Sequence, residues 1–216
     1  MTLEPMTDFF AARVEGYDEH MLKNVDGCRE GYEKMAELLP DSVKSLLDLG
    51  CGTGLELDEI FKTKPELSVT GVDLSKSMLD CLRRKHPEKN LTLLEASYFD
   101  ADFGVEAFDA AVSFETMHHF SHAEKIGLYA KICRALRPGG RYIECDYMVT
   151  DQKEEDFYYA ENARLRREQN IPQNAFYHYD TPCTVENQIA MLQKAGFSKA
   201  EAVWRSGNTI MIVAEK

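Results

Sequence analysis

Short apolar runs alternate with amphipathic stretches along most of the chain. Five apolar runs are too short for helices and predict buried parallel strands at 46–49, 67–73, 91–95, 108–114 and 141–147. Apolar residues spaced by three and four predict helices at 55–62, 76–85, 124–136 and 184–194. The pattern therefore predicts an α/β protein with helices on both faces of a mostly parallel sheet.

Three segments depart from this alternation. Residues 1–40 predict helices without a strand, the first capped by Thr7 or Asp8. Strands at 202–204 and 209–214, separated by a turn at 206–208, predict a final hairpin that makes one strand antiparallel. Residues 148–183 are charged and rich in aromatic residues, with a helix expected from 154 to 169. We interpret this segment as a helical insertion that forms a substrate lid, or as an ordinary surface helix.

A glycine turn follows the first predicted strand. Gly50, Gly52 and Gly54 alternate with other residues and are followed by a helix, which is the layout of a nucleotide-binding crevice. The spacing is one residue shorter than the dinucleotide fingerprint G-x-G-x-x-G. Asp48, just before the turn, would repel a phosphate and suits a ligand with a cationic end.

A second acid fits the same crevice. Asp73 lies nineteen residues after Gly54, at the tip of the next predicted strand. An acid at about this distance accepts hydrogen bonds from ribose hydroxyls in nucleotide-binding folds. Ser75 is expected to cap the helix that follows.

These residues resemble the class I S-adenosylmethionine-dependent methyltransferases. The resemblance lies in the stretches 47–54 and 71–75 and in the Leu-Arg-Pro-Gly-Gly turn at 136–140. It implies a Rossmann-like methyltransferase fold, with a seven-stranded mostly parallel sheet and an antiparallel C-terminal strand. It also implies S-adenosyl-L-methionine as cofactor, S-adenosyl-L-homocysteine as product and a small-molecule acceptor.

The resemblance further implies which residues hold the cofactor. Asp48 would lie near the ammonium group, Asp73 at the ribose, and Tyr17 near the methionine end, with residues 1–40 folded over the site. Ala96-Ser97 stands where the family commonly has an aspartate near the adenine. The full expected set is Tyr17, Asp48, Gly50, Cys51, Gly52, Gly54, Asp73, Leu74, Met78, Ala96, Ser97 and Phe114.

Catalytic residues are less defined. If the acceptor is an amine or a hydroxyl, a base must remove its proton, and the candidates at predicted strand ends are Glu115, His118, Glu144 and Tyr147. A carbanion or thiolate acceptor needs no base. His118 and His119 allow three interpretations: a base, a structural pair or a metal pair. Adjacent side chains of an extended segment point opposite ways, so we expect no metal site.

Composition narrows the possible partners. A length of 216 residues suits one domain, and the formal net charge of −12 argues against nucleic acid or an anionic membrane as partner. Six cysteines without a C-x-x-C pair argue against zinc, and neither a signal-peptide pattern nor a transmembrane run is seen. We therefore expect a cytoplasmic protein. Two alternatives remain: a binding protein of the same fold without catalysis, and a nucleotide-cofactor oxidoreductase.

Overall fold

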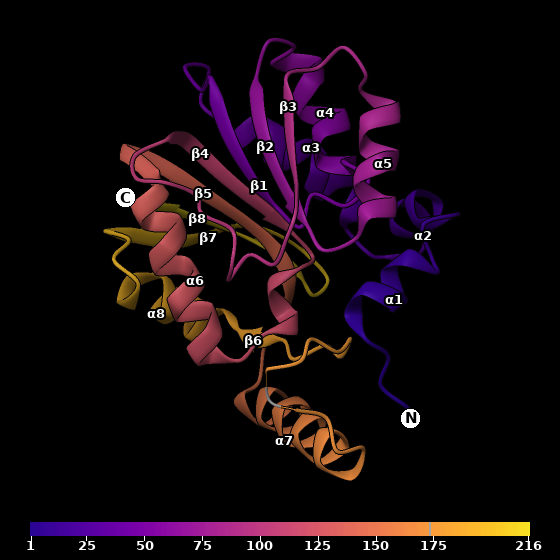
Figure 1. Cartoon of the computed structure of the whole chain (residues 1–216). Helices are drawn as coiled ribbons and strands as arrows, with labels where there is room; N and C mark the ends of the chain where they lie inside the picture. The colour runs from indigo at the N-terminus through magenta and orange to yellow at the C-terminus, as the bar shows by residue number, and fades with distance from the viewer. Residues whose placement is uncertain (173) are drawn as a thin grey trace.

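The computed structural model describes residues 1–172 and 174–216. Its sheet follows the strand order β3-β2-β1-β4-β5-β8-β7, and the short β6 pairs with β5 (Figure 1). β8 is antiparallel to both of its neighbours, and the other pairings are parallel. The bounds are β1 Ser45–Leu49, β2 Ser68–Asp73, β3 Leu91–Glu95, β4 Phe108–Phe114, β5 Leu136–Val149, β6 Cys183–Thr184, β7 Lys199–Ser206 and β8 Thr209–Glu215. The expected mostly parallel sheet with an antiparallel C-terminal strand is confirmed, with β6 as an eighth strand.

Helices cover both faces of this sheet, as expected. Successive residues of a strand point to opposite faces, so Leu46 packs in one core with α3 and α4, whereas Leu47 packs in the other with α6 and α8. The bounds are α1 Met6–Ala11, α2 Tyr17–Asn24, α3 Cys28–Leu38, α4 Leu55–Thr63, α5 Lys76–Lys85, α6 His122–Ala135, α7 Gln152–Glu168 and α8 Val185–Lys194. No helix in the described part of the chain has the length and hydrophobicity needed to cross a membrane.

Two of the boundaries that differ from the expectation have a clear structural cause. α1 begins at Met6 after Pro5, not at a Thr7 or Asp8 cap, because Pro5 ends an extended segment that pairs with Tyr177. β5 already begins at Leu136, which pairs with Phe108, and its register with β4 then shifts across the turn before Arg141. The Pro-Gly-Gly turn therefore forms a bulge inside the strand pairing instead of preceding it.

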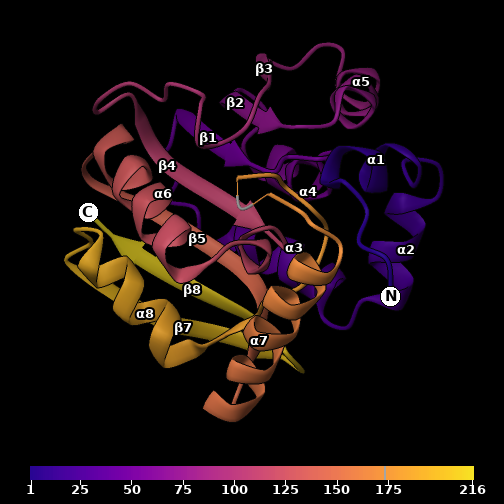
Figure 2. The same cartoon turned by 60° about the horizontal axis from the view of Figure 1, so that its bottom comes forward.

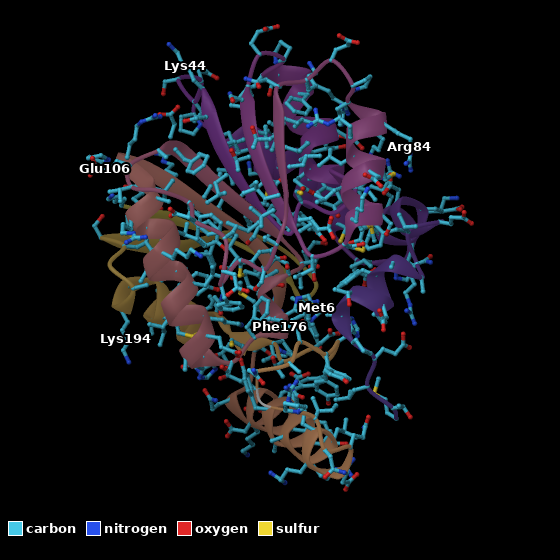
Figure 3. All side chains as sticks on the ribbon, viewed as in Figure 1. Met6, Lys44, Arg84, Glu106, Phe176 and Lys194 are labelled. Atoms are coloured by element: carbon cyan, nitrogen blue, oxygen red, sulfur yellow. The ribbon has the colours of Figure 1, made fainter. Side chains whose placement is uncertain are left out.

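The N-terminal segment and the loop after α7 lie side by side. The Met6 N–H donates to the Phe176 carbonyl at 3.0 Å, and the His178 N–H donates to the Glu4 carbonyl at 2.9 Å. Figure 2 shows α7 and this loop in front of the sheet, and Figure 3 shows Met6 close to Phe176. The Thr181 N–H also donates to the carbonyl of His118, which follows β4. These bonds hold both segments near the carboxyl ends of the strands.

Candidate active site

The turn after β1 carries three glycines with left-handed backbone conformations. A Cβ atom on Gly50 would lie 2.6 Å from Tyr98 Oη, whereas one on Gly52 would meet nothing closer than 3.8 Å. Packing therefore excludes a side chain at the first glycine. The open space at Gly52 leaves its backbone accessible to a ligand.

Asp73 joins this turn to the start of α5. One carboxylate oxygen accepts from the Gly52 N–H at 3.0 Å and the other from the Ser75 N–H at 2.7 Å. Burial raises the pKa of Asp73 to about 6, and the backbone donors partly oppose that rise. The expected cap is confirmed, because Ser75 Oγ accepts from the Met78 N–H. Asp73 thus stands beside the glycine turn with a carboxylate that titrates near neutral pH.

A cleft opens in front of Gly50, Gly52 and Asp73, and we call it the inner cleft. Seven of the expected cofactor residues line it: Tyr17, Gly50, Gly52, Asp73, Leu74, Met78 and Phe114. Sequence reasoning missed the others, which are Met6, Thr7, Phe10, Ser75, Tyr98, Thr116 and His119, and named Glu115 only as a base. Gly54, Ala96 and Ser97 do not line it: Ser97 instead accepts backbone N–H groups of the following turn.

Asp48 and Cys51, which were expected to contact the cofactor, do not line the inner cleft. The Asp48 side chain is 1% exposed, and neither of its oxygens has a well-formed hydrogen bond to a described residue. Burial and the nearby Glu56 raise its pKa well above the usual value, and burial raises the pKa of Glu56 to about 7. Cys51 is buried against Gly71. Both side chains lie in the core beneath the turn.

This buried acid pair predicts a pH effect on stability. Because the folded-state pKa of Glu56 is above its usual value, the folded protein binds that proton more tightly, and stability is lost as pH rises through about 7. In Glu56→Gln, an uncharged side-chain amide takes the place of the carboxyl group, and its NH₂ group can donate a hydrogen bond to Asp48 at any pH. We expect its melting temperature to rise at pH 8, by about 2–4 °C for each kcal/mol gained, and to change little at pH 5.

Thermal unfolding at the two pH values measures this effect. Glu59→Gln, on the exposed side of the same helix where Glu59 pairs with Lys62, is the matched control. A lower melting temperature of Glu56→Gln at pH 8 would contradict the expected cost of burying an ionised Glu56.

Glu115 directly follows β4 and has a strained backbone conformation. Its φ is +48°, which is unusual for a residue with a side chain. Its N–H donates to the Cys145 carbonyl at 2.8 Å, and its carboxyl lies 3.4 Å from Thr209 Oγ1 and 3.6 Å from His118 Nδ1. Burial raises the pKa of Glu115 to about 8, although the charge of His118 opposes this. The neighbouring strand thus fixes this carboxyl where it lines the inner cleft.

His118 and His119 lie on a short 3-10 helix, η1 (Met117–His119), and not on an extended segment. Their ring centroids are 4.1 Å apart, and both rings face the Asp180 carboxylate. This corrects the expectation that they point opposite ways. Burial disfavours a charged His118, but Asp146 and Asp180 outweigh it and hold its pKa well above the usual value. Burial and the charge of His118 lower the pKa of His119.

A larger cavity of about 1000 Å³ adjoins the inner cleft, and we call it the outer cavity. Its wall contains aromatic rings and carboxylates, together with Arg13, which pairs with Glu4. Three of the four candidate bases line it: Glu115, His118 and Tyr147. The rings and carboxylates are those of Phe9, Phe10, Tyr17, Tyr147, His178, Glu15, Asp26, Glu115 and Asp180.

Glu144, the remaining candidate base, lies elsewhere. It is fully buried and hydrogen-bonded to Gln188 of α8, on the side of the sheet that packs against α6 and α8. It lines neither cavity, because the pleat of β5 directs it to the opposite face from Cys145.

The sequence matches both a protein-family model and individual characterised proteins. Residues 46–140 match the family model of the methyltransferase domain. A carboxy-S-adenosyl-L-methionine synthase of Nautilia profundicola is 24% identical over 99% of this chain and 96% of its own length. The O-methyltransferase cnsE of Penicillium expansum is 31% identical over 69% of this chain, but this match spans only 56% of the fungal protein.

The fold is also found in solved structures. Human N-acetylserotonin methyltransferase, solved in complex with S-adenosylmethionine, superposes with a TM-score of 0.67 at 16% identity. The match covers 99% of this chain and 60% of the human one. This likeness concerns the fold, and the chain described here is the shorter of the two.

Proposed function

We propose that the chain, whose residues 46–140 match the methyltransferase domain family, transfers a methyl group from S-adenosylmethionine in the inner cleft to a small acceptor in the outer cavity. One observation carries the proposal: the two spaces share a wall. Phe10, Tyr17, Glu115 and His119 line both. The two spaces therefore adjoin, so that a donor in one and an acceptor in the other would lie next to each other, both in contact with these four side chains.

The residues of the inner cleft suit this cofactor. Asp73 presents a carboxylate for the ribose hydroxyls, and Leu74 and Met78 offer apolar contacts for the adenine. The open backbone at Gly52 accepts the amino-acid end. Tyr17 and Phe10 place aromatic rings at the shared wall, where a sulfonium is favoured by their π-faces.

The protein's part in the reaction is then largely positioning. The bound cofactor supplies a methyl group that is already electrophilic. The outer cavity holds the acceptor so that its nucleophilic atom faces the shared wall, which is the contribution of proximity and orientation. Glu115 takes the proton of a hydroxyl or amine acceptor when it is ionised, and its pKa of about 8 makes this step faster as pH rises toward that value. The loop after α7 lines the outer cavity through His178 and Asp180, in keeping with a substrate lid.

The charges of the outer cavity indicate the class of acceptor. Four carboxyl groups line it, although the raised pKa of Glu115 lowers its share of the negative charge, and both Arg13 and His118 are already paired with acids. A neutral phenol or an amine fits this wall, whereas an acceptor with its own carboxylate is repelled. The aromatic rings favour a flat acceptor.

The experiment has two parts. Calorimetry with S-adenosylmethionine and with NADH tests the inner cleft, and strong NADH binding without sulfonium binding would favour an oxidoreductase. Turnover to S-adenosylhomocysteine is then followed with matched phenols, amines and carboxylate-bearing analogues. We expect kcat/KM to be at least about tenfold lower for the carboxylates, the effect of about 1.4 kcal/mol of repulsion. Cofactor binding without turnover on the panel would instead favour a binding protein.

A further inference from the structure

We propose that His118, His119 and Asp180 form a binding site for a divalent transition-metal ion in the wall of the outer cavity. The three side chains bring two imidazole nitrogens and one carboxylate oxygen within 4.8 Å of one another. They come from η1 and from the loop after α7. The site itself does not depend on the proposed acceptor.

Two of the distances within the group match the spacing of ligand atoms around one metal ion. Asp180 Oδ1 lies 3.5 Å from His118 Nε2 and 3.5 Å from His119 Nδ1. Two ligands at about 2.1 Å from one tetrahedral ion lie about 3.4 Å apart. The observed separations therefore leave room for one ion between the three atoms.

Two of these atoms have no well-formed hydrogen bond to any described residue. His119 Nδ1 and Asp180 Oδ1 are buried and unsatisfied within this part of the chain, and the His119 side chain is only 3% exposed. Unpaired buried polar atoms cost free energy and call for a ligand, an ion or water. A cation between the two atoms would satisfy both at once.

The surrounding residues orient these ligands. Asp146 accepts a hydrogen bond from His118 Nδ1, which turns Nε2 toward Asp180. A carboxylate behind a ligating histidine is the usual support of such sites. The Thr181 backbone and hydroxyl both donate to the His118 carbonyl, which ties the Asp180 loop to η1. An ion would replace the proton on Nε2.

The ligand types indicate the metal. Two imidazoles and one carboxylate suit Zn²⁺, Fe²⁺, Co²⁺ or Mn²⁺, whereas Mg²⁺ and Ca²⁺ prefer oxygen ligands. Three protein ligands leave a position open, as in catalytic zinc sites. His178 Nε2, 3.8 Å from the same oxygen of Asp180, stands beside it. If the proposed methyl transfer holds, an acceptor oxygen at the open position would lose its proton more readily.

The test measures metal binding without cofactor or acceptor, so that its failure leaves the methyl-transfer proposal untouched. Protein stripped with a chelator is titrated calorimetrically with Zn²⁺, Co²⁺ and Mg²⁺, and bound metal is counted after dialysis. We expect one Zn²⁺ or Co²⁺ per chain and no Mg²⁺. His119→Ala and the part-exposed Asp180→Asn should each weaken Zn²⁺ by at least about 100-fold. Asp146→Asn should weaken it by about 10- to 100-fold, as expected for a supporting residue.

Two controls decide which site is filled. His20→Ala removes another histidine of the outer cavity and should leave the affinity unchanged. Cys183→Ser disables a second cluster, formed by His122, Glu155 and Cys183, and should also leave it unchanged. Melting temperatures confirm that each variant is folded. The proposal is overturned by an absence of Zn²⁺ and Co²⁺ binding, or by binding that survives in both His119→Ala and Asp180→Asn, whichever other cluster then holds the ion.

Discussion

Replacing Glu115 by glutamine is expected to lower kcat by about 10²- to 10⁴-fold, the usual contribution of a positioned general base. The affinity for S-adenosylmethionine should stay within about threefold, because the amide keeps the size of the side chain. Single-turnover formation of S-adenosylhomocysteine and calorimetry of cofactor binding measure the two quantities. This expectation applies to a hydroxyl or amine acceptor.

The geometry supports Glu115 over the other carboxyl groups. Among the described residues, it is the one acid that lines both the inner cleft and the outer cavity. Its backbone is held at φ +48° by the bond to Cys145. Such strain persists where the surrounding structure fixes it, often at functional sites. The strand pairing therefore directs this carboxyl at the shared wall.

Glu15→Gln is the matched control, since Glu15 lines the outer cavity but not the inner cleft. Its kcat should change by less than about threefold. Zinc content is measured in the wild type and both variants, because Glu115 lies 3.6 Å from His118. If Glu115→Gln keeps wild-type kcat on a hydroxyl acceptor, the proton leaves by another route and Glu115 is not the base.

The sheet and the glycine turn could be predicted because the information is local. A buried parallel strand is a continuous apolar run, so β1 to β4 are evident from their own residues. The distance from Gly54 to Asp73 is set by one helix and one strand, and it correctly predicted that Asp73 lies beside the turn. Because β1 and β2 are adjacent parallel strands, the residues that follow their carboxyl ends lie close together, independently of the later elements.

The start of β5 and the environment of the Asp48 side chain could not be predicted from local sequence. β5 begins early because Leu136 pairs with Phe108, a contact with a distant strand. Asp48 was expected to face a ligand, but its carboxyl lies beneath the turn near Glu56 of α4. The packing of the following helix on the strand decided this, and a strand residue alone does not reveal it.

The outer cavity depends on contacts between the N-terminal segment and the loop after α7. Phe9 packs on His178 with ring centroids 3.5 Å apart, and Pro5 pairs with Tyr177. No periodicity in either segment predicts these contacts. The histidine pair was misjudged for a local reason: a 3-10 turn brings neighbouring rings together, whereas an extended segment separates them.

Asp73→Ala is expected to weaken binding of S-adenosylmethionine by about 1–3 kcal/mol, or roughly 5- to 150-fold, through lost charged hydrogen bonds to the ribose. The carboxylate also holds the Gly52 N–H, so part of the loss comes from the turn itself. Asp73→Asn, which keeps the size of the side chain, should lose a similar amount. Asp80→Ala on the exposed side of α5, where Asp80 pairs with Lys76, should leave the affinity unchanged.

The pH dependence of the same affinity separates the ribose role from a structural one. The pKa of Asp73 is about 6, and the ionised form is the one that accepts two hydroxyl donors. Protonation therefore competes with the cofactor below that value, and Kd should rise as pH falls from 7 to 5, approaching tenfold per unit at the acid end. Asp73→Asn has no proton to gain there, so its Kd should stay flat over this range. A wild-type Kd that does not change between pH 7 and 5, or an Asp73→Ala variant with unchanged affinity at pH 7, would show that the ribose does not rely on this carboxylate.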